Sequence, residues 1–144
     1  MIKIICVGKI KESFYRDAIS EYMKRLSKYV KIELIEVNDS DIVHEKELIL
    51  NRIDKKDYVV TLEINGVEMD SLGFSKFIDK TFIEHANICF VIGGSNGLDK
   101  GVSKISNYKL SFSKMTFPHQ LFRVILLEQI YRAYKIINNE TYHK

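Results

Sequence analysis

Hydrophobic and polar positions along this chain follow two patterns, one typical of strands and the other typical of helices. Stretches rich in apolar and β-branched residues predict strands, and they cover residues 2–7, 32–37, 58–64, 87–92 and 108–113. Between them, apolar residues at three- and four-residue spacing predict amphipathic helices. These helices cover residues 12–29, 41–52, 71–85 and 120–137, with one or two helical turns within 98–105.

Strands that alternate with helices predict an α/β fold in which helices flank a parallel sheet. Residues 2–7 and 87–92 are apolar almost throughout, so we expect them to form central strands that are covered on both faces. The dipeptide Asn65-Gly66 follows the third strand and predicts a tight turn. The chain has 144 residues and no internal repeat, so we expect a single domain over residues 1–144.

Three segments of the predicted fold should form one crevice, because ligands of parallel sheets bind beyond the carboxyl ends of the strands. These segments are Leu62-Glu63, the glycine-rich Gly93–Gly97 and the connection Ser113–Pro118. The glycines allow a ligand to approach closely, but they lack the spacing of a dinucleotide fingerprint and could form only a tight turn. Pro118 keeps the preceding residues extended, either as a rigid connector or with their backbone available to a flat ring such as adenine.

The last predicted helix, residues 120–137, is apolar on nearly every side except for a row formed by Glu128, Arg132 and Lys135. A surface helix needs only one apolar stripe. We therefore expect this helix both to lie in the core and to pack against a second subunit. His119 and His143 could each act as a base, a proton donor or a phosphate partner, or they could be structural.

The composition excludes several classes of protein. Apolar residues make up 46% and charged residues 28% of the chain, which is typical of a globular protein, and no apolar run is long enough to span a membrane. The N-terminal strand is too short for a secretory signal. Cys6 and Cys89 lie in apolar strands, where we expect buried free thiols in a reducing cytoplasm. No ligand spacing predicts a metal site.

The net charge of +3 is unevenly distributed along the chain. Residues 1–32 carry eight Lys and Arg against three Asp and Glu, residues 33–70 carry four against eleven, and residues 71–144 carry ten against five. These charges form ordinary solvated faces, or the two ends of the chain meet in one basic surface that binds a polyanion.

Motifs distributed over the whole chain form a specific combination of a glycine turn, a Pro-His joint and a Tyr-His chain end. The segments concerned are Val7–Lys11, Glu21-Tyr22, Arg25-Leu26, Val60–Glu63, Ile92–Leu98, Leu110–His119, Arg123-Val124, Glu128–Ala133 and Tyr142–Lys144. This combination resembles the ribosomal RNA large subunit methyltransferase H family, within the SPOUT class of α/β-knot methyltransferases. The segment from Asn38 to Glu47 looks shorter than in many relatives.

The resemblance implies an activity, a cofactor and partners. Members of the family use S-adenosylmethionine to methylate N3 of a pseudouridine in helix 69 of 23S rRNA, and they act on the assembled 70S ribosome in the cytoplasm. The resemblance also implies a homodimer and a C-terminal trefoil knot within about residues 90–144. It implies neither a metal nor a membrane partner.

The resemblance assigns roles to particular residues of this chain. The expected cofactor-binding residues are Leu62, Gly94, Ser113, Lys114, Met115, Thr116, Phe117 and Pro118. The expected catalytic residues are Tyr142 and His143. They are expected to lie beside the partner subunit's cofactor, where they orient the target base and help its N3 proton leave. The expected RNA-binding residues are Lys9, Lys11, Arg16, Arg25, Lys28, His119, Arg123 and Lys144.

Two alternatives from other classes stay open. A ribosome-binding or RNA-binding module without enzymatic activity would bind ribosomes but have no affinity for S-adenosylmethionine. A nucleotide-dependent oxidoreductase is disfavoured by the missing dinucleotide fingerprint. Such an enzyme would be stabilised against heat by a nicotinamide cofactor and not by S-adenosylmethionine.

Overall fold

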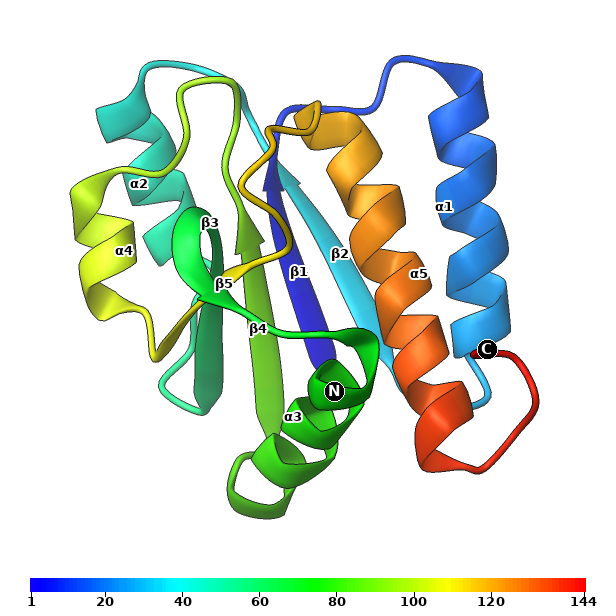
Figure 1. The fold of residues 1–144 in the computed structure, drawn as a ribbon. Helices are drawn as coiled ribbons and strands as arrows, with labels where there is room; N and C mark the ends of the chain where they lie inside the picture. Colours follow the sequence, from blue (N-terminus) through cyan, green and yellow to red (C-terminus); the bar gives the residue numbers. More distant parts are fainter.

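The computed structural model describes residues 1–144, in which five strands alternate with five helices (Figure 1). The strands are β1 (Ile2–Val7), β2 (Ile32–Val37), β3 (Asp57–Glu68), β4 (Asn87–Ile92) and β5 (Tyr108–Ser111). The helices are α1 (Ser13–Leu26), α2 (Ile42–Leu50), α3 (Ser71–Glu84), α4 (Lys100–Ile105) and α5 (His119–Ile137). Every predicted strand and helix is therefore present, and most of the differences lie at the ends of the elements.

All five strands form one parallel sheet in the order β2-β1-β4-β3-β5. In its centre, Ile4 of β1 is paired with Leu34 of β2 on one side and with Phe90 of β4 on the other. All of β1 is buried, as is β4 after Asn87. The prediction that these two apolar strands are central is confirmed, because only an interior position covers both faces of a strand.

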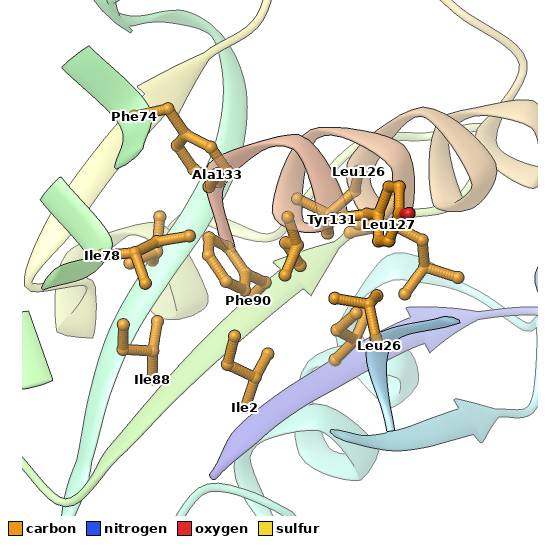
Figure 2. Close-up of a cluster of buried hydrophobic side chains, with 14 of the residues drawn as sticks. Ile2, Leu26, Phe74, Ile78, Ile88, Phe90, Leu126, Leu127, Tyr131 and Ala133 are labelled. Atoms are coloured by element: carbon orange, nitrogen blue, oxygen red, sulfur yellow. The ribbon is translucent and has the colours of Figure 1, made fainter. Parts of the chain in front are cut away.

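The helices form one layer on each face of the sheet. Helices α1, α5 and α3 cover one face, with α5 between the other two, whereas α2 and α4 cover the opposite face (Figure 1). The larger core lies under the three-helix layer and includes Phe74 of α3, Phe90 of β4 and Leu127 of α5 (Figure 2). The smaller core lies under the two-helix layer and includes Val91 of β4 and Val102 of α4.

The structure differs from the prediction at the end of the third strand. The prediction of a tight turn at Asn65-Gly66 is wrong, because β3 continues to Glu68. The register of β3 against β5 shifts between Leu62 and Val67. At this irregularity Gly66 lies against the backbone of β5, and a Cβ atom on it would be only 2.6 Å from the carbonyl oxygen of Lys109. The glycine is needed for close backbone approach.

None of the 19 residues of α5 is exposed, although most of them are only half-buried. The expectation that it lies in the core is confirmed by the burial of Leu126, Leu127 and Ile130. The expected second subunit and the trefoil knot stay predictions. None of the helices combines the length and the apolar character needed to cross a membrane.

We expect the contribution of the main core to be measurable with two isoleucines of α3. Ile78 is fully buried beneath the helix, whereas Ile83 on the same helix is 81% exposed. Replacing Ile78 with Ala should lower the free energy of unfolding by about 2–5 kcal/mol, because a cavity remains. Ile83→Ala should change it by less than about 0.5 kcal/mol. Urea unfolding of both variants measures the difference, and equal losses would contradict this assignment of the core.

Candidate cofactor site

A cavity of about 470 Å³ opens at the carboxyl ends of β3, β4 and β5. Its walls come from the end of β3, the glycine-rich loop after β4, the connection from β5 to α5, and the first residues of α5. These loops lie together at the upper edge of the sheet in Figure 1. The structure thus brings together the three segments that sequence analysis assigned to one crevice, and the volume suits a nucleoside-sized ligand.

Most of the expected cofactor-binding residues line this cavity. Those that do are Leu62, Gly94, Ser113, Met115, Thr116 and Phe117. Lys114 and Pro118 are exposed and are not part of its wall. Pro118 is instead the N-cap of α5, where its carbonyl oxygen accepts a hydrogen bond of 2.9 Å from the amide of Phe122. The proline therefore sets the start of the helix, which fixes the position of the loop before it.

The glycine-rich loop has a tight turn whose geometry requires glycine. Gly97 has a φ of +75°, and its amide donates a hydrogen bond of 3.0 Å to the carbonyl oxygen of Gly94. A Cβ atom on Gly93 would be 2.6 Å from the carbonyl oxygen of Gly97, and one on Gly94 would be 2.9 Å from Cγ1 of Val7. The loop is therefore both a tight turn and part of the cavity wall, so the two readings of the sequence are compatible.

The connection from β5 to α5 is fixed by hydrogen bonds within it. The Ser111 hydroxyl donates to the carbonyl oxygen of Ser113 at 3.1 Å, and the amide of Met115 donates to Oγ of Ser113 at 3.0 Å. Phe117 and Phe122 form an edge-to-face pair with ring centroids 5.7 Å apart, and both line the cavity. The loop offers a flat apolar ring both an aromatic wall and an ordered backbone.

Glu63 is a site residue whose support could not be read from the sequence. Its carboxylate accepts hydrogen bonds from Thr61 Oγ1 at 2.6 Å and from Ser103 Oγ at 2.9 Å. Ser103 lies on α4, which no sequence pattern connected to the end of β3. Glu63 lines the cavity, and a carboxylate held in this way can accept hydrogen bonds from ligand hydroxyl groups.

The structure contradicts the assignment of Arg123 to RNA phosphate. Its side chain is fully buried, and Nη2 donates to the carbonyl oxygens of Val7 at 2.7 Å and Gly8 at 2.8 Å. Nη1 forms an ion pair of 2.8 Å with Glu36. The guanidinium thus joins the first turn of α5 to the carboxyl ends of β1 and β2. The sequence pattern of the last helix gave no reason to expect that Arg123 would bond to distant carbonyl groups.

His119 lies at the cavity and not on the open basic face. It is the first residue of α5 and it lines the cavity. Its Nε2 atom is 3.6 Å from where a Cβ atom of Gly8 would be. This position is compatible with contact to a ligand or to RNA at the mouth of the cavity, and the RNA-binding role of His119 stays a prediction.

The other expected RNA-binding residues are exposed and lie away from the cavity wall. They are Lys9, Lys11, Arg16, Arg25, Lys28 and Lys144. Among them, Arg25 forms an exposed ion pair of 2.9 Å with Glu21, and its guanidinium lies over the ring of Tyr22. Two of these residues, Arg16 and Arg25, lie on α1, and Lys28 follows its C-terminal end.

The last seven residues fold back against α5. Asn139 has a φ of 55° and reverses the chain, and the amide of Glu140 then donates to the carbonyl oxygen of Lys135 at 2.8 Å. The Glu140 carboxylate accepts hydrogen bonds from Tyr29 at 2.8 Å and from Lys135 at 3.1 Å. A left-handed residue after a helix that returns an amide to the last turn is a common helix end, and here it holds the tail in place.

Beyond this turn, both expected catalytic side chains contact α5. Tyr142 lies edge-on to Tyr131, with ring centroids 5.0 Å apart, and its hydroxyl donates to Glu128 at 3.3 Å. Nδ1 of His143 lies 3.1 Å from Nη1 of Arg132. Burial, followed by the charge of Glu128, raises the pKa of the Tyr142 phenol. The phenol is therefore neutral at physiological pH and acts as a hydrogen-bond donor.

The structure does not bring these catalytic candidates to the cavity of the same chain. His119 at the cavity and Glu128 at the tail are nine residues apart on α5, which corresponds to about 14 Å along a helix. The tail leaves α5 at the end opposite the cavity loops and folds back along the helix (Figure 1). Within one chain, the cofactor residues and the catalytic candidates therefore occupy separate places.

Neither the thiols nor a metal cluster adds to this site. Burial raises the pKa of both Cys6 and Cys89 to about 12, so neither is a thiolate at neutral pH. No three His, Cys, Asp or Glu side chains lie close enough together to hold a metal ion.

Comparisons with known proteins agree with this geometry. A family model described as predicted SPOUT methyltransferase matches residues 1–143. Proteins named ribosomal RNA large subunit methyltransferase H, from Clostridium botulinum and Clostridium tetani, are 51% and 52% identical to this chain over 157 positions. Each alignment covers 99% of both chains. Since the alignments are longer than the 144 residues of this chain, the relatives carry residues that it lacks.

A solved structure gives independent support for the fold. A probable methylase family protein from Haemophilus influenzae superposes with a TM-score of 0.59, over 99% of this chain and 70% of that one. The two sequences are only 11% identical, so this likeness concerns the fold alone. A parallel α/β sheet with this cavity, matched by the family model, defines a SPOUT methyltransferase. The chain belongs to the ribosomal RNA large subunit methyltransferase H family within that class.

We expect Arg123 to act on stability and not directly on RNA affinity. Arg123→Ala should lower the free energy of unfolding by about 3–5 kcal/mol, because it removes a fully buried guanidinium from a partly exposed ion pair and leaves buried carbonyl groups unpaired. The matched control is Arg25→Ala, which removes an exposed ion pair and should cost at most about 1 kcal/mol. Urea unfolding measures both. Unchanged stability with weakened RNA binding would restore the original assignment.

We also expect the position of the tail to depend on pH through Glu140. Hydrogen bonds from Tyr29 and Lys135 lower the pKa of its carboxyl from the ordinary value of 4.5. Because the pKa of Glu140 is lower in the folded protein than in the unfolded chain, its carboxylate stabilises the docked tail at pH values above the ordinary pKa. This stabilisation is lost as the pH falls through the pKa that Glu140 has in the folded protein. NMR order parameters of residues 140–143 should therefore fall in that acidic range. Glu140→Gln should remove this pH dependence and Glu21→Gln should keep it; the same profile in both variants would contradict the role of Glu140.

Proposed function

We propose that this protein transfers a methyl group from S-adenosylmethionine to N3 of a pseudouridine in helix 69 of 23S rRNA, on the assembled 70S ribosome in the cytoplasm. The observation that carries the proposal is the cavity at the carboxyl ends of β3, β4 and β5 in a member of this methyltransferase family. The reaction would use residues 1–144 as one unit.

The residues of the cavity fit an adenosyl group. Phe112, Phe117 and Phe122 give it aromatic walls, and the fixed Glu63 carboxylate can accept hydrogen bonds from ribose hydroxyl groups. Backbone groups of residues 113–117 are available to the edge of the adenine ring. The cofactor supplies a methyl group bound to a sulfonium. The task of this chain is then to position that group, which accounts for a large part of the rate in displacement reactions.

The second task is to bring the RNA base to the cavity and to remove its N3 proton. Tyr142 and His143 can hydrogen-bond to a base and assist departure of the proton. They lie too far from the cavity of their own chain, and α5 has half-buried apolar residues such as Leu121 and Ile125 on its outer side. Both observations support a homodimer in which the tail of one protomer serves the cavity of its partner.

The third task is to hold the ribosome. The basic residues on and before α1, together with Lys144, form an exposed surface for the rRNA backbone. Charge neutralisation by Lys and Arg supplies most of the affinity for phosphates, and it decreases with salt concentration.

Labelled S-adenosylmethionine tests the proposal directly. Incubation with 70S ribosomes that lack the modification should place the label on one pseudouridine of helix 69, which mapping of the modified nucleotide identifies. Absence of transfer to ribosomes, free 50S subunits and free 23S rRNA would contradict the proposal.

A variant of the tail serves as the control for the catalytic assignment. His143→Ala should retain binding of S-adenosylhomocysteine, since the tail lies outside the cavity, and should lose at least about a hundredfold in turnover, as is typical for a lost acid or base. Full turnover in this variant would exclude the role of His143 and leave the proposed activity intact.

A further inference from the structure

A second hollow of about 360 Å³ adjoins the cofactor cavity. Leu110, Phe112 and Phe117 line both spaces, so the two share one wall. The rest of the second hollow is formed by the segment before α3, the first turn of α3 and the middle of α5. Neither Ser71 nor Gln129, which line this second hollow, has a role in the cofactor site or the tail.

One side of this hollow is aromatic. Phe74, Phe112 and Phe117 all line it, and the rings of Phe74 and Phe112 are nearly perpendicular, with centroids 5.9 Å apart. Aromatic side chains on one side of a hollow favour the binding of a flat ring. A nucleic-acid base that has left its stack recovers stacking energy when it packs against such side chains. Its volume lies at the lower end of the range for small-molecule sites, which suits a single ring.

The other side carries hydrogen-bonding groups. The Ser71 hydroxyl donates to Oε1 of Gln129 at 2.8 Å, and Nε2 of Gln129 donates to Glu128 at 3.1 Å, which leaves one N–H of that amide for a ligand. Asp70 accepts from the amide of Gly73 through Oδ1 at 2.7 Å, and its Oδ2 atom accepts no hydrogen bond from the protein. The hollow therefore offers one donor and one acceptor beside a flat apolar wall.

We infer that this second hollow binds a pyrimidine base that is turned out of the RNA substrate. A pyrimidine has a flat ring with a carbonyl oxygen and an N–H on one edge, which match the Gln129 donor and the Asp70 acceptor. An aliphatic side chain would bond to neither group. Enzymes that act on a base in structured RNA or DNA must take it out of the stack, and the shared wall places such a base beside the cofactor cavity.

The inference rests on the proposed function, and its test compares variants of the hollow with a matched control. Gln129→Met and Ser71→Ala should each reduce kcat/KM for the ribosome by about tenfold, the size expected for a lost hydrogen bond of about 1.4 kcal/mol. Both should bind S-adenosylhomocysteine within twofold of the unsubstituted protein. The control Ser75→Ala changes a buried serine on the same helix as Ser71. Ser75 bonds only to the carbonyl oxygen of Leu72, and its replacement should leave kcat/KM unchanged.

A direct binding experiment removes the dependence on turnover. Pseudouridine nucleoside, added at millimolar concentration to the isotopically labelled protein with S-adenosylhomocysteine, should shift the NMR signals of Ser71 and Gln129. Gln129→Met should abolish the shift at Ser71. No shift at these residues, or the same shift in the variant, would overturn the inference.

The outcomes also separate this inference from the proposed function. If the unsubstituted protein transfers no methyl group to rRNA, the proposed function fails. If it does, and both variants keep its kcat/KM, only the role of the hollow is overturned. If the variants instead change the dimer dissociation constant and leave kcat/KM unaltered, the hollow receives a side chain of a second copy and the inference is wrong.

Discussion

The buried guanidinium of Arg123 determines where the functional end of this molecule is placed. It joins the first turn of α5 to the carbonyl groups that end β1 and to Glu36 of β2. These elements are far apart in sequence, and the first residue of α5 lies in the wall of the cavity. A buried cation with unpaired carbonyl groups nearby would be costly, so the strand ends and the start of α5 hold a fixed relative position.

From this fixed point, α5 separates two sets of residues. Its first residue lies at the cofactor cavity, and its second half carries the tail that ends in Tyr142 and His143. A rigid helix keeps these two sets apart within a chain. In the homodimer proposed above, the tail of one protomer would serve the cavity of its partner and so bring the two sets together. The same helix provides the half-buried apolar surface that such an assembly would cover.

The cavity itself depends on backbone geometry more than on side-chain chemistry. Glycines at positions 93, 94 and 97 let a tight turn lie against β1, and serine hydroxyls fix the loop that follows β5. Few charged groups face this space, and the one fixed carboxylate, Glu63, is held by Thr61 and Ser103. Such a lining suits a neutral flat ring and a sugar, whereas the basic surface for a polyanion lies outside it.

The sequence by itself determined the elements and the edge of the sheet where ligands bind. Apolar runs identify strands such as β1 and β4, since burial on both faces leaves few polar positions, and parallel strands place their following loops at one edge. The tertiary structure decided what depends on contacts between distant residues. Arg123 became a structural cation because two carbonyl groups of β1 meet it, and Gly66 lies in an irregular strand because β5 approaches it closely. The local sequence pattern indicates the periodicity of apolar residues and the conformational preference of each segment. Neither property specifies which distant backbone groups a side chain will contact.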